Sequence, residues 1–412
     1  MKLQGAATEQ VAVAPRPSNR AGPLKVLIVV EPGLDGVFRH VEGLVQYFLQ
    51  KGNRVHLAYS SCRSGAAMQQ LVERVRRAGG EVRDLRVSNI PQPGDVLAFL
   101  RLAALVRRVR PDVIHAHSSK AGALARGVAK LFRHPRCFYT PHAYYGMAKP
   151  PWFRVRFFNQ IERILGQWGH TIAISQDEAN FALRTLRIPR ERLVVIHNPV
   201  DTARFKPATA EEKRAARARF GIPADAIVLA TIGRMCWQKD PETAYQAVAP
   251  LCAENPRLMF LHLGWGKWKS YLLGLAARLG YGSQVRILDY VDDPRSFYHA
   301  VDGVLVSSRY EAGWPLVFLE AMACNLPVIA STCPGMSDLG RAGLSHVWTY
   351  PPENVAACTA QTRHWLEAVT RELTDSNHRR FAIERLSPER CYGAVYDLYR
   401  SSSVRTRVTP LS

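Results

Sequence analysis

Two glutamates and two cations in this chain have the types and spacing needed for chemistry on a negatively charged substrate. Arg234 and Lys239 follow a predicted strand, Ile227–Ile232, and Glu311 and Glu320 lie beyond a later apolar run. The carboxyl ends of parallel strands meet at one edge of an open α/β sheet, and such folds bind ligands at that edge. A guanidinium fork and a lysine ammonium both suit phosphate oxygens. We therefore predict a phosphate-binding site at this edge of the sheet.

The segment from residue 302 to residue 331 is expected to position the two carboxylates. It is predicted to form a strand, an irregular loop broken by Gly313 and Pro315, a short helix over Phe318–Cys324 and a second strand. Asn325 suits the left-handed conformation that often ends a helix. This arrangement places Glu311 at a strand edge and Glu320 at the start of the helix, where the helix dipole stabilises a carboxylate.

Both halves of the chain alternate apolar strands with amphipathic helices, a pattern that predicts two doubly wound parallel sheets. The boundary between the two domains is expected within residues 198–207. The predicted strands are Lys25–Val30, Val55–Tyr59, Val113–His117, Cys137–Thr140 and Thr171–Ile174 in the first half, and Ile227–Ile232, Met259–Leu263, Val285–Leu288, Val304–Val306 and Val328–Ala330 in the second.

The glutamate segment resembles the signature of glycosyltransferase family 4, whose members are retaining, sugar-nucleotide-dependent enzymes. That signature has two glutamates around a small–aromatic–small loop, then Glu-Ala-Met-Ala, a turn residue and Pro-Val. This chain departs from it, because eight residues instead of seven separate Glu311 from Glu320 and Ala312-Gly313-Trp314-Pro315 replaces Gly-Phe-Gly. The resemblance implies that Glu311 lies near the donor sugar and that Glu320 accepts hydrogen bonds from the donor ribose. It also places Gly313 and Trp314 in the donor-binding loop.

Three further motifs support the resemblance. Gly233-Arg234 and Lys239 match the family's Gly-Arg-(four residues)-Lys loop, which implies that all three bind the donor and that both cations serve catalysis. Gly36 lies in a loop before Arg-His-Val, where the family has Gly-Gly, and would let a ligand approach a helix N-terminus. His142 follows a predicted strand, and the resemblance implies hydrogen bonding to the donor sugar instead of a nucleophilic role.

Other positions near these motifs have less defined roles. His115 and His117 end another predicted strand and match no catalytic position, so they are candidates for lining the acceptor cleft. Asp201 belongs to a segment that resembles the family's interdomain hinge and is expected to be structural. Trp265 stands where an acidic residue is common in the family. It is a candidate for setting base or sugar preference.

The resemblance implies the GT-B fold, in which two Rossmann-like doubly wound domains face a cleft and a C-terminal helix crosses back to the N-terminal domain. We expect a disordered tail over residues 1–23, an acceptor-binding domain over 24–200 and a nucleotide-sugar-binding domain over 201–386. Residues 387–412 should supply the returning helix and a tail. The first 23 residues lack the central apolar region of a secretion signal.

The net charge of +21 is concentrated in the first half of the chain. Residues 1–200 hold 30 Lys and Arg against 13 Asp and Glu, a balance of +17, whereas residues 201–412 hold 25 against 21, a balance of +4. This asymmetry suggests a surface facing a polyanion or an anionic membrane, although a generally basic composition is an alternative. No nucleic-acid-binding signature is present, so nucleic acid is not an expected partner.

A segment after Pro151 mixes arginines with Trp152, Phe153 and Phe157. It is predicted to be helical and has two interpretations. It is either a basic amphipathic helix that lies in a membrane interface or a core helix whose aromatic side chains pack on the first sheet.

The sequence thus predicts a retaining hexosyltransferase that moves a sugar from a nucleoside-diphosphate donor to a saccharide or lipid-linked acceptor. Cell-envelope or exopolysaccharide synthesis in the cytoplasm, or on the inner face of the cytoplasmic membrane, is the expected setting. No cofactor and no metal are expected, since the chain has no Asp-x-Asp motif. The alternatives are a catalytically inactive GT-B scaffold that binds polyanions or membranes, and a GT-B sugar-nucleotide epimerase or phosphorylase.

Overall fold

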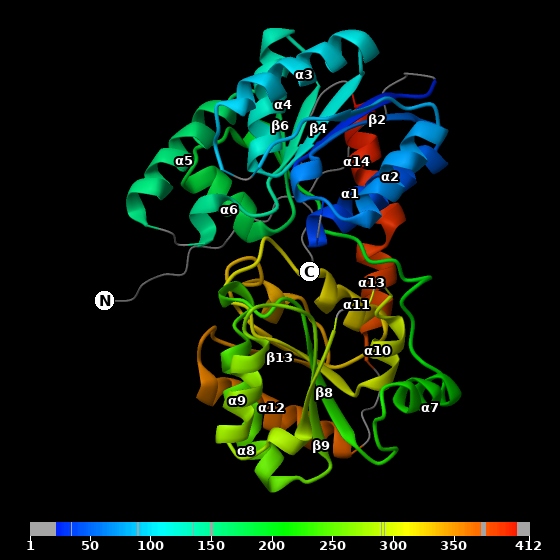
Figure 1. The fold of residues 1–412 in the computed structure, drawn as a ribbon, viewed down its shortest axis with the longest axis vertical. Coiled ribbons are helices and arrows are strands. Elements are labelled where there is room, and N and C mark those ends of the chain that lie inside the picture. Colours follow the sequence, from blue (N-terminus) through cyan, green and yellow to red (C-terminus); the bar gives the residue numbers. More distant parts are fainter. Residues whose placement is uncertain are drawn as a thin grey trace. The chain divides into compact units, whose positions relative to one another are not determined.

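The computed structural model describes residues 22–401 apart from residues 34, 89, 135, 149–150, 290, 292 and 372–375. The tail expected at residues 1–23 therefore lies almost wholly outside the described residues, as does the tail expected after the last helix. The chain forms two compact units (Figure 1). Unit 1 comprises the described residues up to Asn198 together with those from Pro388 onward, and unit 2 comprises Pro199–Ser387.

Unit 1 is built on a seven-stranded parallel sheet in the order β3-β2-β1-β4-β5-β6-β7. The order reverses between β1 and β4, which makes the carboxyl ends of these two strands the topological switch point where doubly wound sheets bind ligands. The strands are β1 (Lys25–Val30), β2 (Arg54–Tyr59), β3 (Val82–Asp84), β4 (Val113–His117), β5 (Cys137–Thr140), β6 (His170–Ala173) and β7 (Leu193–Val195).

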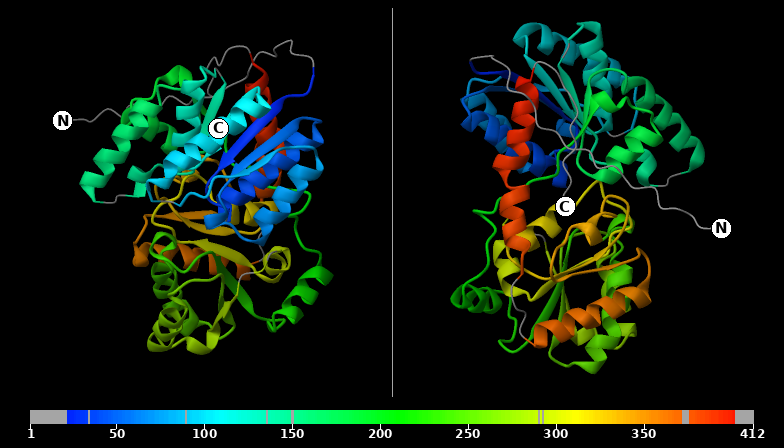
Figure 2. Two further views of the ribbon diagram at one scale, coloured as in Figure 1. Left: turned by 45° about the horizontal axis from the view of Figure 1, so that its top comes forward. Right: turned by 180° about the vertical axis from the view of Figure 1, so that it is seen from behind.

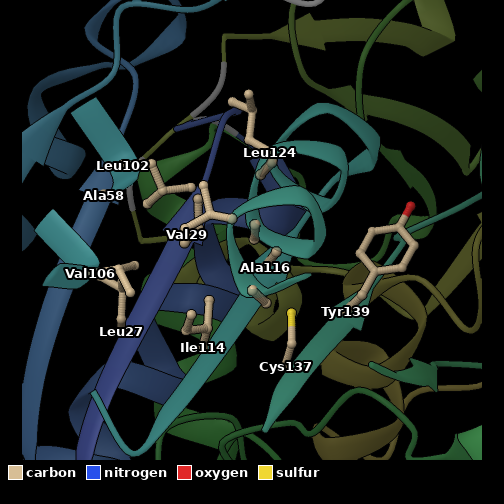
Figure 3. Close-up of a cluster of buried hydrophobic side chains, with 14 of the residues drawn as sticks. Leu27, Val29, Ala58, Leu102, Val106, Ile114, Ala116, Leu124, Cys137 and Tyr139 are labelled. Atoms are coloured by element: carbon tan, nitrogen blue, oxygen red, sulfur yellow. The ribbon is translucent and has the colours of Figure 1, made fainter. Parts of the chain in front are cut away.

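Helices cover both faces of this sheet, because side chains on a strand alternate between the two faces. Leu27 and Val29 of β1 pack toward one helix layer, as Figure 3 shows, whereas Val26 and Ile28 join the core on the other face. The helices of unit 1 are α1 (Asp35–Gln50), α2 (Ala66–Arg77), α3 (Gly94–Val109), α4 (Ser119–Leu131), α5 (Trp152–Leu165), α6 (Gln176–Arg184) and α14 (Pro388–Arg400).

Helix α14, shown in red in Figure 2, packs into unit 1 although its residues follow unit 2 in the sequence. Tyr392 and Tyr399 are buried in the same core as α1, and the Tyr392 hydroxyl donates a hydrogen bond of 3.0 Å to the carbonyl of His40. A Cβ atom at Gly43 of α1 would lie 2.5 Å from the Tyr392 hydroxyl oxygen, so α1 needs glycine there for α14 to approach.

Unit 2 repeats the same topology with a six-stranded parallel sheet in the order β10-β9-β8-β11-β12-β13. Its switch point lies between β8 and β11. The strands are β8 (Ile227–Ile232), β9 (Leu258–Leu263), β10 (Val285–Leu288), β11 (Gly303–Val306), β12 (Val328–Ser331) and β13 (Val347–Tyr350), and the helices are α7 (Ala210–Arg219), α8 (Pro241–Glu254), α9 (Lys269–Arg278), α10 (Arg295–Ala300), α11 (Leu316–Ala323), α12 (Val355–Thr370) and α13 (His378–Leu386).

Two local predictions need correction, and one is confirmed. Helix α11 begins at Leu316 because Pro315 takes the N-cap position with extended backbone, so Glu320 lies in the second turn and not at the helix start. Helix α1 begins at Asp35, which places Gly36 inside the first turn and not in a preceding loop. Asn325 does end α11 in the left-handed conformation, with φ of 59°.

Helix α5 forms where it was predicted, but the interpretation as a core helix is wrong. Glu162 is the side chain of this helix that is buried, while Trp152, Phe153 and Phe157 are exposed. Within the described part of the chain, no helix is both long enough and apolar enough to cross a membrane.

Candidate active site

In unit 2, the predicted site residues Lys239 and Glu311 lie in contact beside the switch point. The Lys239 ammonium is 2.5 Å from Glu311 Oε1, and the Ser308 hydroxyl donates to the same oxygen at 2.5 Å. The Glu311 side chain is buried, with 8% of its surface exposed, whereas Lys239 is 23% exposed. The extra residue between the two glutamates therefore does not keep Glu311 away from Lys239. Because Lys239 remains partly accessible beside this fixed carboxylate, its ammonium can bind a phosphate group.

The backbone around Glu311 is held by the turn after β12. The Glu311 N–H donates to the Pro334 carbonyl at 2.8 Å. Gly335 has φ of +94°, and a Cβ atom there would lie 2.1 Å from the Glu311 carbonyl oxygen. Ser331 adds a hydrogen bond of 2.6 Å from its hydroxyl to the Ser308 carbonyl. Residue 335 must consequently be glycine for Glu311 to keep this position.

Arg234 follows β8 and is linked to the loop that carries Glu311. Its guanidinium donates to Gln238 Oε1 at 3.2 Å, and Gln238 Nε2 donates to the Tyr310 carbonyl at 3.3 Å. Gly233, with φ of +147°, packs directly against the loop after β9, since a Cβ atom at Gly264 would lie 1.9 Å from the Gly233 carbonyl oxygen. The two glycines thus bring the loops after β8 and β9 into close contact.

Glu320 and Trp314 have defined partners of their own. The Tyr298 hydroxyl donates to Glu320 Oε2 at 2.7 Å. The Trp314 ring is buried, lies 6.0 Å from the Phe381 ring in a tilted arrangement and donates from Nε1 to Asp338 at 3.0 Å. The side chain of Trp314 therefore anchors its loop beside the buried Gly313.

Sequence reasoning did not identify the ionic support beneath Lys239. Asp240 has φ of +45° and lies 3.0 Å from the Arg309 guanidinium, and Ser307 donates to the Lys239 carbonyl at 3.0 Å. Burial raises the pKa of Asp240, while its bond from Thr243 and the charge of Arg309 oppose this rise. The adjacent Lys239 and Asp240 could have suggested a charged cluster. The ion-pair partner of Asp240, Arg309, lies about 70 residues further along the chain, so the spacing could not identify it.

In unit 1, the predicted residue His142 belongs to a group of buried histidines at the switch point. His142 Nε2 and His117 Nδ1 are 3.1 Å apart, so that one nitrogen donates and the other accepts. The His40 ring lies 4.9 Å from the His142 ring, and His40 Nδ1 is 3.0 Å from Asn198 Oδ1. His40 and His117 were therefore underrated by sequence reasoning, although His117 and His115 are two apart on one strand and must share a face.

These histidines are neutral because they are buried. Desolvation lowers the pKa of His40 to about 4, although the hydrogen bond that Asn198 Oδ1 accepts from the His40 ring opposes this fall. Desolvation and the neighbouring histidines lower the pKa values of His117 and His142 well below the usual range. His115 is more fully engaged, with Nε2 2.9 Å from the Thr140 hydroxyl and Nδ1 bonded to Tyr399. The group offers uncharged donors and acceptors, which suit sugar hydroxyls better than phosphates.

The backbone that carries His142 is strained and is held by a buried carboxylate. His142 and Ala143 have φ values of +55° and +81°. Glu178 accepts from the Ala143 N–H at 2.7 Å and from the Ile174 N–H at 2.8 Å. Burial raises the pKa of Glu178 to about 7, despite the opposing effect of these two bonds. Glu178 is a positioning residue that the sequence motifs did not reveal.

Gly36 is exposed in the first turn of α1. A Cβ atom at Gly36 would meet no atom within 4 Å, so the first turn of α1 is open at this point.

His40, His117 and His142 could together hold a metal ion, because their ligand atoms lie within 4.8 Å of one another. The absence of a metal and of any other cofactor remains a prediction.

Two parallel doubly wound units, one with a charged loop cluster at its switch point, define a glycosyltransferase of the GT-B fold, and two family models agree. Residues 34–204 match the model for glycosyltransferase family 4, and residues 212–380 match the model for glycosyl transferases group 1. A D-inositol 3-phosphate glycosyltransferase from Thermobispora bispora is 32% identical over 301 residues, which cover 65% of this chain and 67% of that enzyme. A second, from Saccharomonospora viridis, is 30% identical over 77% of this chain and 78% of that enzyme. The chain therefore belongs to glycosyltransferase family 4.

Solved structures have the same fold at lower sequence identity. A glycosyltransferase from Rickettsia africae superposes with a TM-score of 0.76 at 17% identity, over 92% of this chain and 98% of that one. Anabaena Alr3699/HepE in complex with UDP-glucose superposes with a TM-score of 0.75 at 19% identity, over 91% and 99% of the two chains. These likenesses confirm the GT-B fold predicted from the sequence.

Proposed function

We propose that this protein is a retaining hexosyltransferase that transfers a sugar from a nucleoside-diphosphate sugar to a saccharide or lipid-linked acceptor. The contact of Lys239 with Glu311, whose carboxylate also accepts a hydrogen bond from Ser308, at the switch point of unit 2 is the observation that carries the proposal. Support comes also from Alr3699/HepE, which has the same fold and whose structure contains UDP-glucose. Envelope or exopolysaccharide synthesis is the setting that we propose.

In this proposal, Arg234 and Lys239 bind the donor diphosphate. As the glycosidic bond breaks, negative charge grows on the leaving diphosphate, and both cations stabilise the transition state more than the ground state. Lys239 can turn from Glu311 toward the phosphates because it is partly exposed. Glu311 would then retain its bond from Ser308 and face the donor sugar.

The remaining predicted residues orient the donor. Glu320, fixed by Tyr298, accepts hydrogen bonds from the ribose hydroxyls. Gly233, Gly313 and the backbone of Trp314 allow the donor to lie close to the chain. We propose that the reaction needs no metal, since Arg234 and Lys239 supply the positive charge that a bound cation would otherwise provide.

Unit 1 would supply the polar groups that contact sugars. His142 is neutral at physiological pH and can donate or accept a hydrogen bond with a sugar hydroxyl. Gly36 lies in the open first turn of α1, where N–H groups can meet an anionic group of the donor or acceptor. His117 and His40 hold the His142 ring in place.

A thermal-shift panel tests the proposal directly. The full chain is melted with UDP, GDP, ADP and their common sugar conjugates, because a ligand of the native state raises the melting temperature by mass action. We expect a shift with one nucleotide family, which Arg234→Ala abolishes and the exposed control Lys269→Ala preserves. Turnover of the stabilising donor must then disappear in Glu311→Gln. A shift without turnover by the parent would favour the inactive scaffold, and no shift with any nucleotide would refute donor binding.

A further inference from the structure

The outward face of helix α5 is aromatic. Phe153, Phe157 and Ile164 follow one another at spacings of four and seven residues, which places them on a single stripe. Their exposed fractions are 56%, 60% and 52%, and Trp152, beside the stripe, is 76% exposed. Helix α5 lies at the rim of unit 1 in Figure 1. Large apolar side chains gathered on one exposed face mark an interaction surface.

The face of α5 that packs against the rest of unit 1 carries a charged residue, Glu162. Glu162, on the side opposite the stripe, forms a buried ion pair of 2.9 Å with Arg126 of α4 and accepts from the Tyr139 hydroxyl at 3.1 Å. The Arg126 guanidinium also stacks over the Tyr139 ring at 4.0 Å and donates to the Gly122 carbonyl at 2.9 Å. These bonds fix the orientation of the helix, so the aromatic stripe cannot be turned inward without leaving buried charges unpaired.

The charge around the stripe is positive. Arg154 and Arg156 are exposed on the first half of α5, and the acidic residue of the helix, Glu162, is neutralised inside. Residues 101–200 as a whole contain 17 Lys and Arg against five Asp and Glu. Leu131 and Phe132, at the end of the helix α4 that packs against α5, are exposed as well. An acidic lipid surface complements this combination of aromatic and cationic groups.

We propose that α5 is a docking element for an anionic bilayer, with Phe153, Phe157 and Ile164 inserted at the boundary between headgroups and acyl chains. Trp152 lies at headgroup depth, where the amphipathic indole is favoured. Arg154 and Arg156 bind the lipid phosphates. This inference goes beyond the proposed transferase function, because it concerns where the protein resides and not what it transfers. It rests on the α5 surface and needs no donor or acceptor.

Vesicle co-sedimentation of the full chain tests the docking element. The protein is mixed with phosphatidylcholine vesicles that contain or lack phosphatidylglycerol. We expect binding that requires phosphatidylglycerol and weakens as salt is raised, since surface charges are screened. Phe153→Ser with Phe157→Ser should lower the partition coefficient at least ~10-fold. Leu279→Ser with Ile383→Ser removes two exposed apolar side chains from unit 2 and should leave binding unchanged.

The arginines provide a second, independent variant. Replacing Arg154 and Arg156 with Gln should lower the partition coefficient ~5-fold for each arginine and flatten the salt dependence. Circular dichroism and the melting temperature verify that both variants are folded. Because the assay measures binding and not turnover, its result is independent of the thermal-shift panel.

Three outcomes would overturn the inference. The inference fails if the parent protein does not sediment with phosphatidylglycerol vesicles even at low salt, or if it binds equally well after both phenylalanines are replaced. The third outcome is a dimer in solution without lipid that is lost in the phenylalanine variant, which would make a second copy of the chain the occupant of the stripe. Light scattering after gel filtration measures this third case.

Discussion

The two units share one topology but equip their switch points differently. Unit 2 places an ion pair, Lys239 with Glu311, beside its first and fourth strands in chain order, whereas unit 1 places neutral imidazoles, His117 and His142, at the equivalent point. The backbone framework in the two units has the same strand pattern, with the first strand of each unit joined to the fourth. The difference in chemistry is therefore carried by the loops and not by the sheet, as expected for folds whose functional groups sit at strand ends.

In the function that we propose, this contrast assigns the diphosphate of the donor to unit 2 and sugar hydroxyl groups to unit 1. Because Lys239 is partly accessible, its ammonium can leave Glu311 and bind a phosphate group instead. Buried neutral histidines cannot hold a phosphate charge as well, but they can distinguish hydroxyl groups by hydrogen bonding.

Removing the ammonium of Lys239 should have the largest effect. We expect Lys239→Ala to lower kcat/KM by ~10³, because a preorganised charge that stabilises the transition state typically contributes about this much. Steady-state kinetics with the donor found by thermal shift measure the loss. Lys269→Ala, which breaks an exposed ion pair with Asp289, is the matched control and should stay near parental activity. A loss below tenfold for Lys239→Ala would show that the Lys239 ammonium does not stabilise the transition state.

Breaking the buried ion pair of unit 1 should cost stability instead of chemistry. Arg126→Met leaves Glu162 buried without its partner and should lower the free energy of unfolding by about 3–5 kcal/mol. Urea denaturation measures the change. The double variant Arg126→Met with Glu162→Met should recover most of it, since no charge then remains buried. If Arg126→Met were neutral, the inward face of α5 would not be fixed in the way described above.

Acid should weaken unit 1 through its histidines. The pKa of His40 is about 4 in the folded protein, below its ordinary value of 6.5, so the stabilisation is complete above pH 6.5 and is lost as the pH falls toward 4. At pH 5, His40 alone should cost about 2 kcal/mol relative to pH 7. Urea denaturation at both pH values measures the fall in the free energy of unfolding. This fall should be about 2 kcal/mol smaller in His40→Gln than in the parent, and unchanged in the control His364→Gln, whose site is exposed. An equal loss in both variants would contradict the assignment.

The smallest expected effect concerns the carboxylate on α11. Tyr298→Phe removes one hydrogen bond to Glu320, a contribution of about 1 kcal/mol. We expect the KM for the donor to rise about fivefold, with kcat almost unchanged, because the bond orients a binding group and not a reacting one. A comparable fall in kcat would instead place Glu320 close to the chemical step.

The sequence was sufficient to predict the central strands and the edge strand β10, but not the other three edge strands. Runs such as Ile227–Ile232 are apolar throughout because both faces of a parallel strand are covered. The edge strands β3 and β7 are only three residues long and β13 is four, and none of these was predicted. β3 contains Arg83 and Asp84, charged residues that an edge strand tolerates and that hide its apolar pattern.

The same limit applies to the site. The motifs placed Arg234, Lys239 and Glu311 at strand ends, and proximity at a shared sheet edge follows from topology. The partners Ser308 and Arg309 lay within the segment already singled out, yet nothing in the spacing shows which side chain meets which. His40, His117 and Glu178 come from three different elements, and their convergence on the His142 loop depends on how those elements pack.

The return of α14 to unit 1 has a consequence for protein synthesis. The core that α1 shares with Tyr392 and Tyr399 is incomplete until residues 388–400 have been translated. At elongation rates of about 5–20 residues per second, the intervening residues 199–387 take roughly 10–40 s to make. During this interval the nascent unit 1 exposes the apolar face of α1 that α14 later covers. We expect chaperones that bind nascent chains to recognise this face, and unit 2 to be the first part of the chain able to complete its own core.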